Sequence, residues 1–223
     1  MELKKVIEEI AMASFVPGKG IAVLDCGPVS EIEDMKAAAA KIAAQTGSDV
    51  KQKAHGTNWT SPYGSNISHH DLMEIGTPVF LNFIKKYNAP IRSARLNILG
   101  PASGLKQHKE TIVLKEGDTV RLRARFHIPL QTTKAAQVFC NGSWYHLEPG
   151  RLYFFNNGAY HAAHNGGKKD RVHFVFDLWV NTDVAKVLQS GTKVNAIKDE
   201  KINLKAPTDG EYGTALKDKI VLF

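Results

Sequence analysis

The stretch RLRARFHIPLQ, residues 121–131, alternates polar and apolar side chains with a period of two. Successive side chains of a β-strand point to opposite faces, so the two sets would occupy different faces of one strand. The polar set is Arg121, Arg123, Arg125 and His127, and the apolar set is Leu122, Ala124, Phe126, Ile128 and Leu130. The cationic face lies either in water or in an interior, where it needs anionic partners such as a ligand carboxylate.

Further short strands surround this stretch between residues 92 and 180. Their sequences are SARLNIL, TIVLK, AQVFC, WYHL, RLYFF and RVHFVFDLWV. Turn signals separate them, among them Asn141-Gly142 and the Glu-Pro-Gly of residues 148–150. The pattern predicts an antiparallel β domain, a sandwich or jelly roll, whose concave interior can hold a ligand.

Two helices are predicted before the strands. In SEIEDMKAAAAKIAAQTG, residues 30–47, Ser30 is the expected N-cap and Gly47 the expected terminator. In TPVFLNFIKKY, residues 77–87, Thr77 is the expected N-cap and a proline follows in the first turn.

Composition limits the class of protein. The chain has 223 residues, 43% hydrophobic and 23% charged, which suits one globular core. Cys26 and Cys140 are expected to be free buried thiols, because two distant cysteines without a secretion signal rarely form a disulfide. No apolar run reaches the roughly 18 residues of a membrane span, and the acidic N-terminus is unlike a targeting peptide, so we expect a cytoplasmic protein without membrane contact.

The domain organisation is predicted to be simple. We expect a single domain over residues 1–223, mainly β with flanking helices. A helical and loop region would cover about 1–91, a jelly-roll core about 92–180, and an extension 181–223. Within the first region, the polar, glycine-containing residues 54–71 are predicted to form a loop, and the extension is predicted to begin with a short helix at TDVAKVLQ.

The segment LKQHKET, residues 105–111, contains a candidate pair of metal ligands. His108 and Glu110 are two residues apart, and in an extended segment such residues project to the same face, where both could bind one metal ion. The alternative is a solvated charged strand or turn, because His-x-Glu often occurs by accident.

The strand RVHFVFDLWV repeats the two-faced pattern. Its polar face would present Arg171, His173, Val175 and Asp177. His161 precedes Arg171 by ten residues across a glycine-containing turn, and we expect the histidine to end one strand and the arginine to open the next, side by side. A carboxylate bound by Arg171 could then reach a metal held by His161.

Five segments, taken in their order along the chain, resemble the aspartyl/asparaginyl β-hydroxylase family of Fe(II)- and 2-oxoglutarate-dependent oxygenases. They are H-x-E, RFHIPLQT, LEPGRLYFFNN, AYHAAHN and DRVHFVFDLW. Some bacterial free-proline hydroxylases are also similar. The resemblance covers roughly residues 77–180. It implies a double-stranded β-helix, that is, a jelly roll, with Fe(II), 2-oxoglutarate and O₂ as cofactor and co-substrates.

The resemblance also implies roles for individual residues. His108, Glu110 and His161 would be the three ligands of Fe(II). Arg171 would bind the distal carboxylate of 2-oxoglutarate, and the Arg-x-His pair Arg125 and His127 would face the same co-substrate.

The sequence departs from the family pattern at three places. The carboxylate ligand is usually aspartate and is Glu110 here, one methylene longer. The usual FDD is FNN, residues 155–157, and a usual tryptophan is Leu147. We expect the last two departures to affect the choice of substrate rather than metal binding.

Alternatives for the metal ligands stay open. His164, three residues after His161, is a rival second imidazole ligand. The run His69-His70-Asp71 also resembles a metal motif, but neighbouring histidines diverge, so we expect surface or substrate-loop residues there.

The expected activity is hydroxylation of an unactivated C–H bond with release of succinate and CO₂. The substrate would be amino-acid-like and small, although a carrier-bound aminoacyl group or a protein side chain is also compatible. A cupin-like module that binds a metal or small anion without turnover is the alternative, and it has no need for Arg171. The net charge of +7 is spread over scattered lysines, so we expect a solvated basic surface rather than binding or demethylation of nucleic acid.

Overall fold

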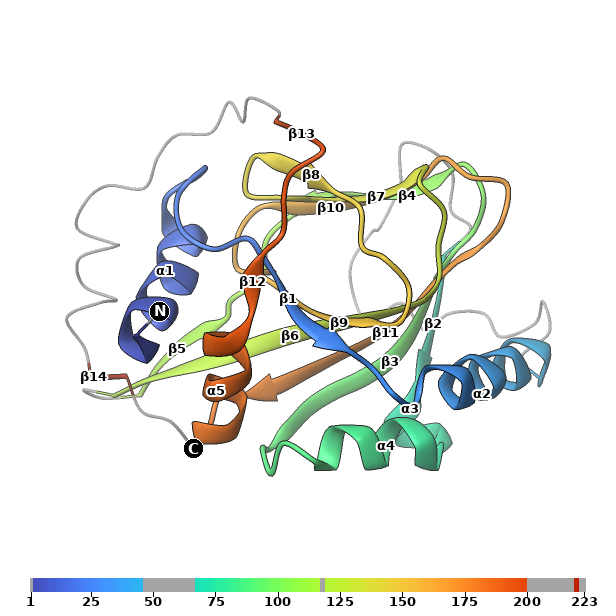
Figure 1. Ribbon diagram of the computed structural model, residues 1–223, viewed down its shortest axis with the longest axis horizontal. Coiled ribbons are helices and arrows are strands. Elements are labelled where there is room, and N and C mark those ends of the chain that lie inside the picture. Colours follow the sequence, from blue (N-terminus) through green and yellow to red (C-terminus); the bar gives the residue numbers. More distant parts are fainter. Residues whose placement is uncertain (1, 46–66, 117–118, 200–218, 221–223) are drawn as a thin grey trace.

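Two mainly antiparallel sheets face each other in the computed structural model, which describes residues 2–45, 67–116, 119–199 and 219–220 (Figure 1). The large sheet has the order β12-β1-β9-β6-β11-β3-β2, with β5 and β14 also paired to β6. The small sheet has the order β13-β8-β7-β10-β4. This arrangement confirms the predicted jelly roll with flanking helices.

The strands of the large sheet are β1 (Val23–Pro28), β2 (Ile67–Asp71), β3 (Ile91–Leu99), β5 (Val113–Glu116), β6 (Thr119–Gln131), β9 (Arg151–Phe155), β11 (Arg171–Trp179), β12 (Thr192–Lys193) and β14 (Lys219–Ile220). Those of the small sheet are β4 (Ser103–His108), β7 (Ala136–Cys140), β8 (Ser143–Tyr145), β10 (His161–Asn165) and β13 (Lys198–Asp199). The helices are α1 (Leu3–Phe15), α2 (Ile32–Gln45), α3 (Leu72–Ile75), α4 (Pro78–Lys85) and α5 (Thr182–Ser190).

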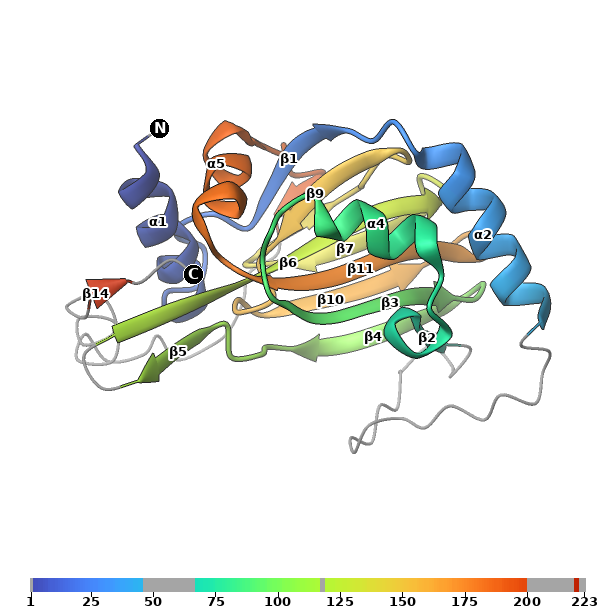
Figure 2. The same cartoon turned by 90° about the horizontal axis from the view of Figure 1, so that it is seen from below.

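The outer face of the large sheet packs against helices, as Figure 2 shows for α2, α4 and α5. Phe126 of β6 and Phe174 and Phe176 of β11 point to this side and are fully buried. Phe80 of α4 lies on Phe174, with ring centroids 4.7 Å apart. The apolar half of each alternating strand therefore forms the main core, and the polar half faces the small sheet.

The predicted helices are present, with small differences at their ends. The helix α2 begins at Ile32, two residues after the expected cap, and Gly47 lies outside the described residues. Thr77 is at the N-cap position of α4, as predicted, but its side chain makes no capping hydrogen bond. The helix expected after residue 180 is α5, and the helix α1 was not predicted as an element.

The predicted loop over residues 54–71 is wrong at its end. Residues 67–71 form β2, which pairs with β3 along its whole length, so the backbone groups of this polar segment are satisfied by a sheet edge. The earlier part of the predicted loop lies outside the described residues.

Other predictions from composition have different outcomes. Cys26 and Cys140 are free thiols, as expected, but only Cys140 is buried and Cys26 is partly buried. No helix in the described part of the chain is long and apolar enough to cross a membrane. A cytoplasmic location and a single domain over the whole chain stay predictions.

Asn156 joins the N-terminal segment to the sheets and explains one departure from the family pattern. Its side-chain nitrogen donates to the carbonyls of Ile10 and Ile21, both at 2.8 Å, and its side-chain oxygen accepts from the backbone nitrogen of Gly158 at 3.1 Å. The residue is fully buried. An aspartate here would direct a carboxylate at two carbonyl oxygens, so asparagine is required by packing in this chain.

We expect Asn156→Asp to lower the free energy of unfolding by at least about 2 kcal/mol, because a buried charged acceptor would lose both of its donor interactions. Denaturant titration measures this loss. The control is Asn82→Asp on the exposed side of α4, which should change stability by less than about 0.5 kcal/mol. Equal stability of the two variants would contradict the role given to Asn156.

Candidate metal centre

Three of the predicted site residues converge between the sheets. One ligand atom from each of His108, Glu110 and His161 lies within 4.8 Å of the others. His108 ends β4 and His161 begins β10, and the register of the two strands places them opposite each other, with ring centroids 4.0 Å apart. Glu110 follows β4 and is held by its backbone nitrogen, which donates to the carbonyl of Asn157 at 2.8 Å.

His161 has the protonation state that a metal ligand requires. Its Nδ1 lies 3.0 Å from the carbonyl of Ala159, and because a carbonyl only accepts, Nδ1 must donate and Nε2 keeps its lone pair. Burial, together with the nearby His108, lowers the pKa of His161 to about 3, so the ring is neutral. Two imidazoles and one carboxylate form the donor set typical of non-haem Fe(II) with three open positions.

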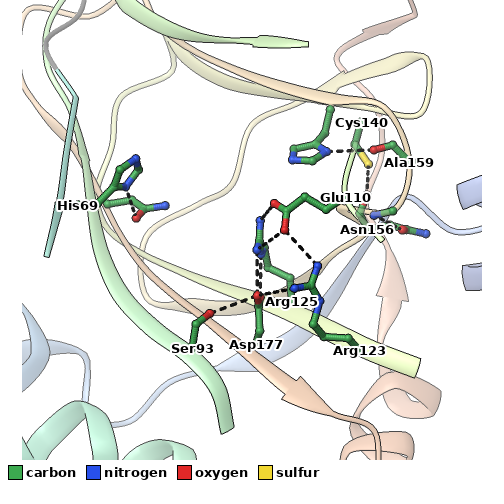
Figure 3. Close-up of polar contacts among 12 residues, drawn as sticks. His69, Ser93, Glu110, Arg123, Arg125, Cys140, Asn156, Ala159 and Asp177 are labelled. Carbon is green, nitrogen blue, oxygen red and sulfur yellow. Dashed lines mark hydrogen bonds and ion pairs between the residues drawn. The ribbon is translucent and has the colours of Figure 1, made fainter. Parts of the chain in front are cut away.

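Glu110 is ionised because arginines surround it. Nη1 of Arg125 lies 2.5 Å from Oε1, and Nη2 of Arg125 and Nη2 of Arg123 each lie 3.0 Å from Oε2 (Figure 3). Burial alone would raise the pKa of Glu110, but the charge and hydrogen bonds of Arg125 outweigh it and lower the pKa to about 2. A metal bound by Glu110 must therefore share or replace these guanidinium contacts.

Arg125 lies between two carboxylates rather than on an open surface. Besides Glu110 it binds Asp177 of β11, through Nε at 2.7 Å and Nη2 at 2.9 Å (Figure 3). Ser93 donates to the same carboxylate at 3.2 Å. The cationic face of β6 thus lines the interior and finds the anionic partners that burial demands.

Arg171 is buried next to two histidines. Its Nη2 donates to Nδ1 of His173 at 3.0 Å. Nδ1 of His127 lies 3.3 Å from Nδ1 of His173. Since a guanidinium only donates, Nδ1 of His173 accepts, and His127 must carry its proton on Nδ1. Both Nε2 atoms are buried without a partner in the described structure.

No carboxylate of the described residues forms an ion pair with Arg171, which is only 5% exposed. Burial lowers the pKa of Arg171 to about 9. A buried guanidinium without an acid is costly, which makes this position a fitting site for the carboxylate of a ligand. His173 belongs to this group, and its only signal in the sequence was its position on the polar face of the strand.

One sequence-based expectation about His161 and Arg171 is wrong. His161 begins β10 rather than ending it, and β10 lies in the small sheet whereas β11 lies in the large one (Figure 1). The turn at residues 166–170 passes the chain from one sheet to the other, so the two residues are not side by side. Arg171 instead faces the interior from the opposite sheet.

The other histidines lie apart from the cluster. His164 is on the face of β10 opposite to His161, as the burial alternation along that strand shows. His70 is buried in β2, which differs from the expected surface position. His69 projects to the other face of β2, is exposed, and binds Asn97 through Nδ1 at 2.7 Å.

Leu147 and Asn157 mark the remaining departures from the family pattern. Leu147 is buried in the apolar cluster between the sheets. Asn157 is 1% exposed, and neither atom of its side-chain amide has a partner in the described structure. Because its carbonyl holds Glu110, Asn157 adjoins the metal-ligand cluster, a role that sequence reasoning missed.

The fold and the cluster define a jelly-roll protein with a two-histidine, one-carboxylate metal site. A family model described as aspartyl/asparaginyl beta-hydroxylase matches residues 29–181. The chain belongs to this family of 2-oxoglutarate-dependent oxygenases, and the match begins well before the resemblance seen in the sequence. Membership and the cluster together support Fe(II) and 2-oxoglutarate as the cofactors.

Solved structures resemble this chain at low sequence identity. AviO1 from Streptomyces viridochromogenes Tue57 is 10% identical with a TM-score of 0.50, over 82% of this chain and 97% of AviO1. HygX from Streptomyces hygroscopicus, with nickel, 2-oxoglutarate and hygromycin B bound, is 12% identical with a TM-score of 0.46, over 74% of this chain and 83% of HygX. No curated relative matches the sequence.

The two histidines of β10 provide a matched test of the metal site. His161→Ala should weaken Mn(II) or Fe(II) binding by more than about 100-fold, because even the loss of an outer hydrogen-bond partner typically costs about 10–100-fold. His164→Ala should bind metal as the wild-type protein does. Titration with either ion measures both, and tight binding by His161→Ala would contradict this ligand set.

The arginine between the two carboxylates provides a test of the charge network. Arg125→Met should lower the free energy of unfolding by about 3–5 kcal/mol, since it removes the main partner of Glu110 and Asp177 and leaves both carboxylates to Arg123 alone. Arg151→Met is the control, because Arg151 binds Asp25 at 2.7 Å with 41% of its side chain exposed and should contribute at most about 1 kcal/mol. Denaturant titration compares them, and similar losses would refute the network.

Proposed function

We propose that the protein is an Fe(II)- and 2-oxoglutarate-dependent hydroxylase of a small amino-acid-like substrate, releasing succinate and CO₂. Arg171 is the observation that supports this best: a buried guanidinium without an acidic partner in the described structure, which faces the same interior as the cluster of metal ligands but from the opposite sheet. A protein that bound only a metal would have no use for this cation.

In the proposal, His108, Glu110 and His161 hold the metal. Bound Fe(II) together with 2-oxoglutarate supplies the activation of O₂ for oxidation of a C–H bond. The protein holds both imidazoles and the carboxylate on strand ends that the sheet pairing fixes, so the donors are preorganised.

Arg171 and its neighbours bind the co-substrate in the proposal. The planar fork of a guanidinium suits a carboxylate, which it can bind through two parallel hydrogen bonds. His173 fixes the orientation of Arg171 by accepting a hydrogen bond from its Nη2, and His127 in turn donates a hydrogen bond to His173. The buried Nε2 atoms of the two histidines are then available to a co-substrate that enters this region.

Glu110 also favours a second candidate function. Because two arginines already hold its carboxylate, the site could bind a metal weakly through two histidines and act as a cupin-like binding module without turnover. Formation of succinate from 2-oxoglutarate separates the two functions. We expect Fe(II)-loaded protein to form succinate with O₂ and to do so faster with one member of a panel of free amino acids; bound metal without succinate would favour the binding module.

Arg171→Ala tests the co-substrate site directly. It should weaken 2-oxoglutarate binding by at least about 30-fold, which corresponds to about 2 kcal/mol for a lost buried charge contact, while metal content stays near that of wild type. Calorimetric titration with 2-oxoglutarate measures the affinity, and Arg151→Ala on the surface is the control. Unchanged affinity in Arg171→Ala would refute the assignment.

A further inference from the structure

Arg95 is an arginine of the interior that neither the metal cluster nor the proposed co-substrate site uses. It lies on β3, opposite Val175 of β11. Its neighbours Ala94 and Leu96 are buried in the core on the helix side, so Arg95 points to the inner face. This is the face that presents Arg171 and Asp177, because residues two apart on β11 share a side.

Arg95 has no ion pair in the described structure. The two inner carboxylates, Glu110 and Asp177, pair with Arg123 and Arg125 instead. Asp71 lies opposite Arg95 on β2, but its Oδ1 accepts from the backbone nitrogens of Met73 and Glu74 at the start of α3. The Nε atom of Arg95 is buried without a hydrogen-bond partner.

The charges around the metal cluster do not balance. We call six residues the inner charge group: Arg95, Arg123, Arg125, Arg171, Glu110 and Asp177. Within this group of described residues, four guanidinium groups face two carboxylates, which leaves an excess of two positive charges. Fe(II) and the dianion of 2-oxoglutarate cancel each other, and His127 and His173 are neutral because burial, with help from the nearby charge of Arg171, lowers their pKa values. The excess therefore persists until another anion binds.

Arg95 and Arg171 leave the large sheet at separate points of its inner face. The partner of Arg95 on β11 is Val175, four residues from Arg171, and four residues of a strand span about 13 Å. If Arg171 binds the distal carboxylate of 2-oxoglutarate and the metal binds its other end, Arg95 is left for a different anion. Its strand is next to β2, the last strand of the sheet, where the exposed His69 holds Asn97 at 2.7 Å (Figure 3).

We propose that the primary substrate is a small acid with a free carboxylate, and that Arg95 binds this carboxylate. The inference rests on the proposed function, because it assigns Arg171 to 2-oxoglutarate. It favours a free amino acid or similar acid over an aminoacyl group on a carrier, whose carboxyl is consumed in the thioester bond.

Matched acids and amides test the proposal. The probes are L-proline, L-aspartate and L-lysine, each with its α-carboxamide, titrated by calorimetry into Mn(II)-loaded protein with 2-oxoglutarate. At least one acid should bind to the wild-type protein, and its amide should bind at least about tenfold more weakly. The Arg95→Met variant should bind that acid more weakly by a similar factor but keep its affinity for 2-oxoglutarate. Arg95→Lys should bind the acid with intermediate affinity.

Several results would overturn the proposal. An amide that binds as well as its acid, an acid that still binds Arg95→Met, or no binding by any of the three acids would each refute it. Weakened 2-oxoglutarate binding in Arg95→Met would move Arg95 to the co-substrate site. Failure of the proposed function is separate, because it would show as wild-type protein that binds no 2-oxoglutarate.

The stability of the ligand-free protein tests the same idea without any substrate. Arg95→Met should raise the melting temperature, because it removes a buried charge without a partner, whereas Arg125→Met should lower it. Both variants exchange an arginine for the same apolar side chain on the same sheet face. A drop for Arg95→Met as large as that for Arg125→Met would show that Arg95 is structural and overturn the proposal.

Discussion

The ion-pair network of Arg125 is the interaction on which the site depends. Arg125 and Asp177 lie on neighbouring strands of the large sheet, and Glu110 follows a strand of the small sheet, so one buried guanidinium links the two sheets. The network satisfies three charges that would be costly alone. It also keeps Glu110 ionised and places it beside His108 and His161, where a carboxylate ligand is needed.

Alternation in β6 and β11 serves stability and function at once. The outward side chains, including Phe126, Phe174 and Phe176, form the core with the helices, and dispersion and burial of apolar area stabilise the fold there. The inward side chains are mostly ionisable. We expect the buried charges of Arg171 and Arg95 to lower stability in the absence of ligands, a cost that binding sites commonly have. The large apolar face allows the inner face to tolerate these unpaired charges.

Part of this account could be predicted from the sequence. Alternation over residues 121–131 predicted both faces of β6, and His108 and Glu110 were identified from a two-residue spacing that a strand end preserves. Pairing between distant strands could not be predicted, so His161 was expected beside Arg171 although it pairs with His108. The hydrogen bonds from the side chain of Asn156 to the carbonyls of Ile10 and Ile21 could not be predicted either, because they join segments more than 130 residues apart.

A crystal structure of the protein with Mn(II) and 2-oxoglutarate tests the central claim most directly. The account predicts one metal bound by His108, Glu110 and His161, with a carboxylate of 2-oxoglutarate on Arg171 and Asp177 still paired with Arg125. In that structure the metal shares or replaces the guanidinium contacts of Glu110. A metal bound elsewhere, or 2-oxoglutarate whose carboxylates avoid Arg171, would contradict the account.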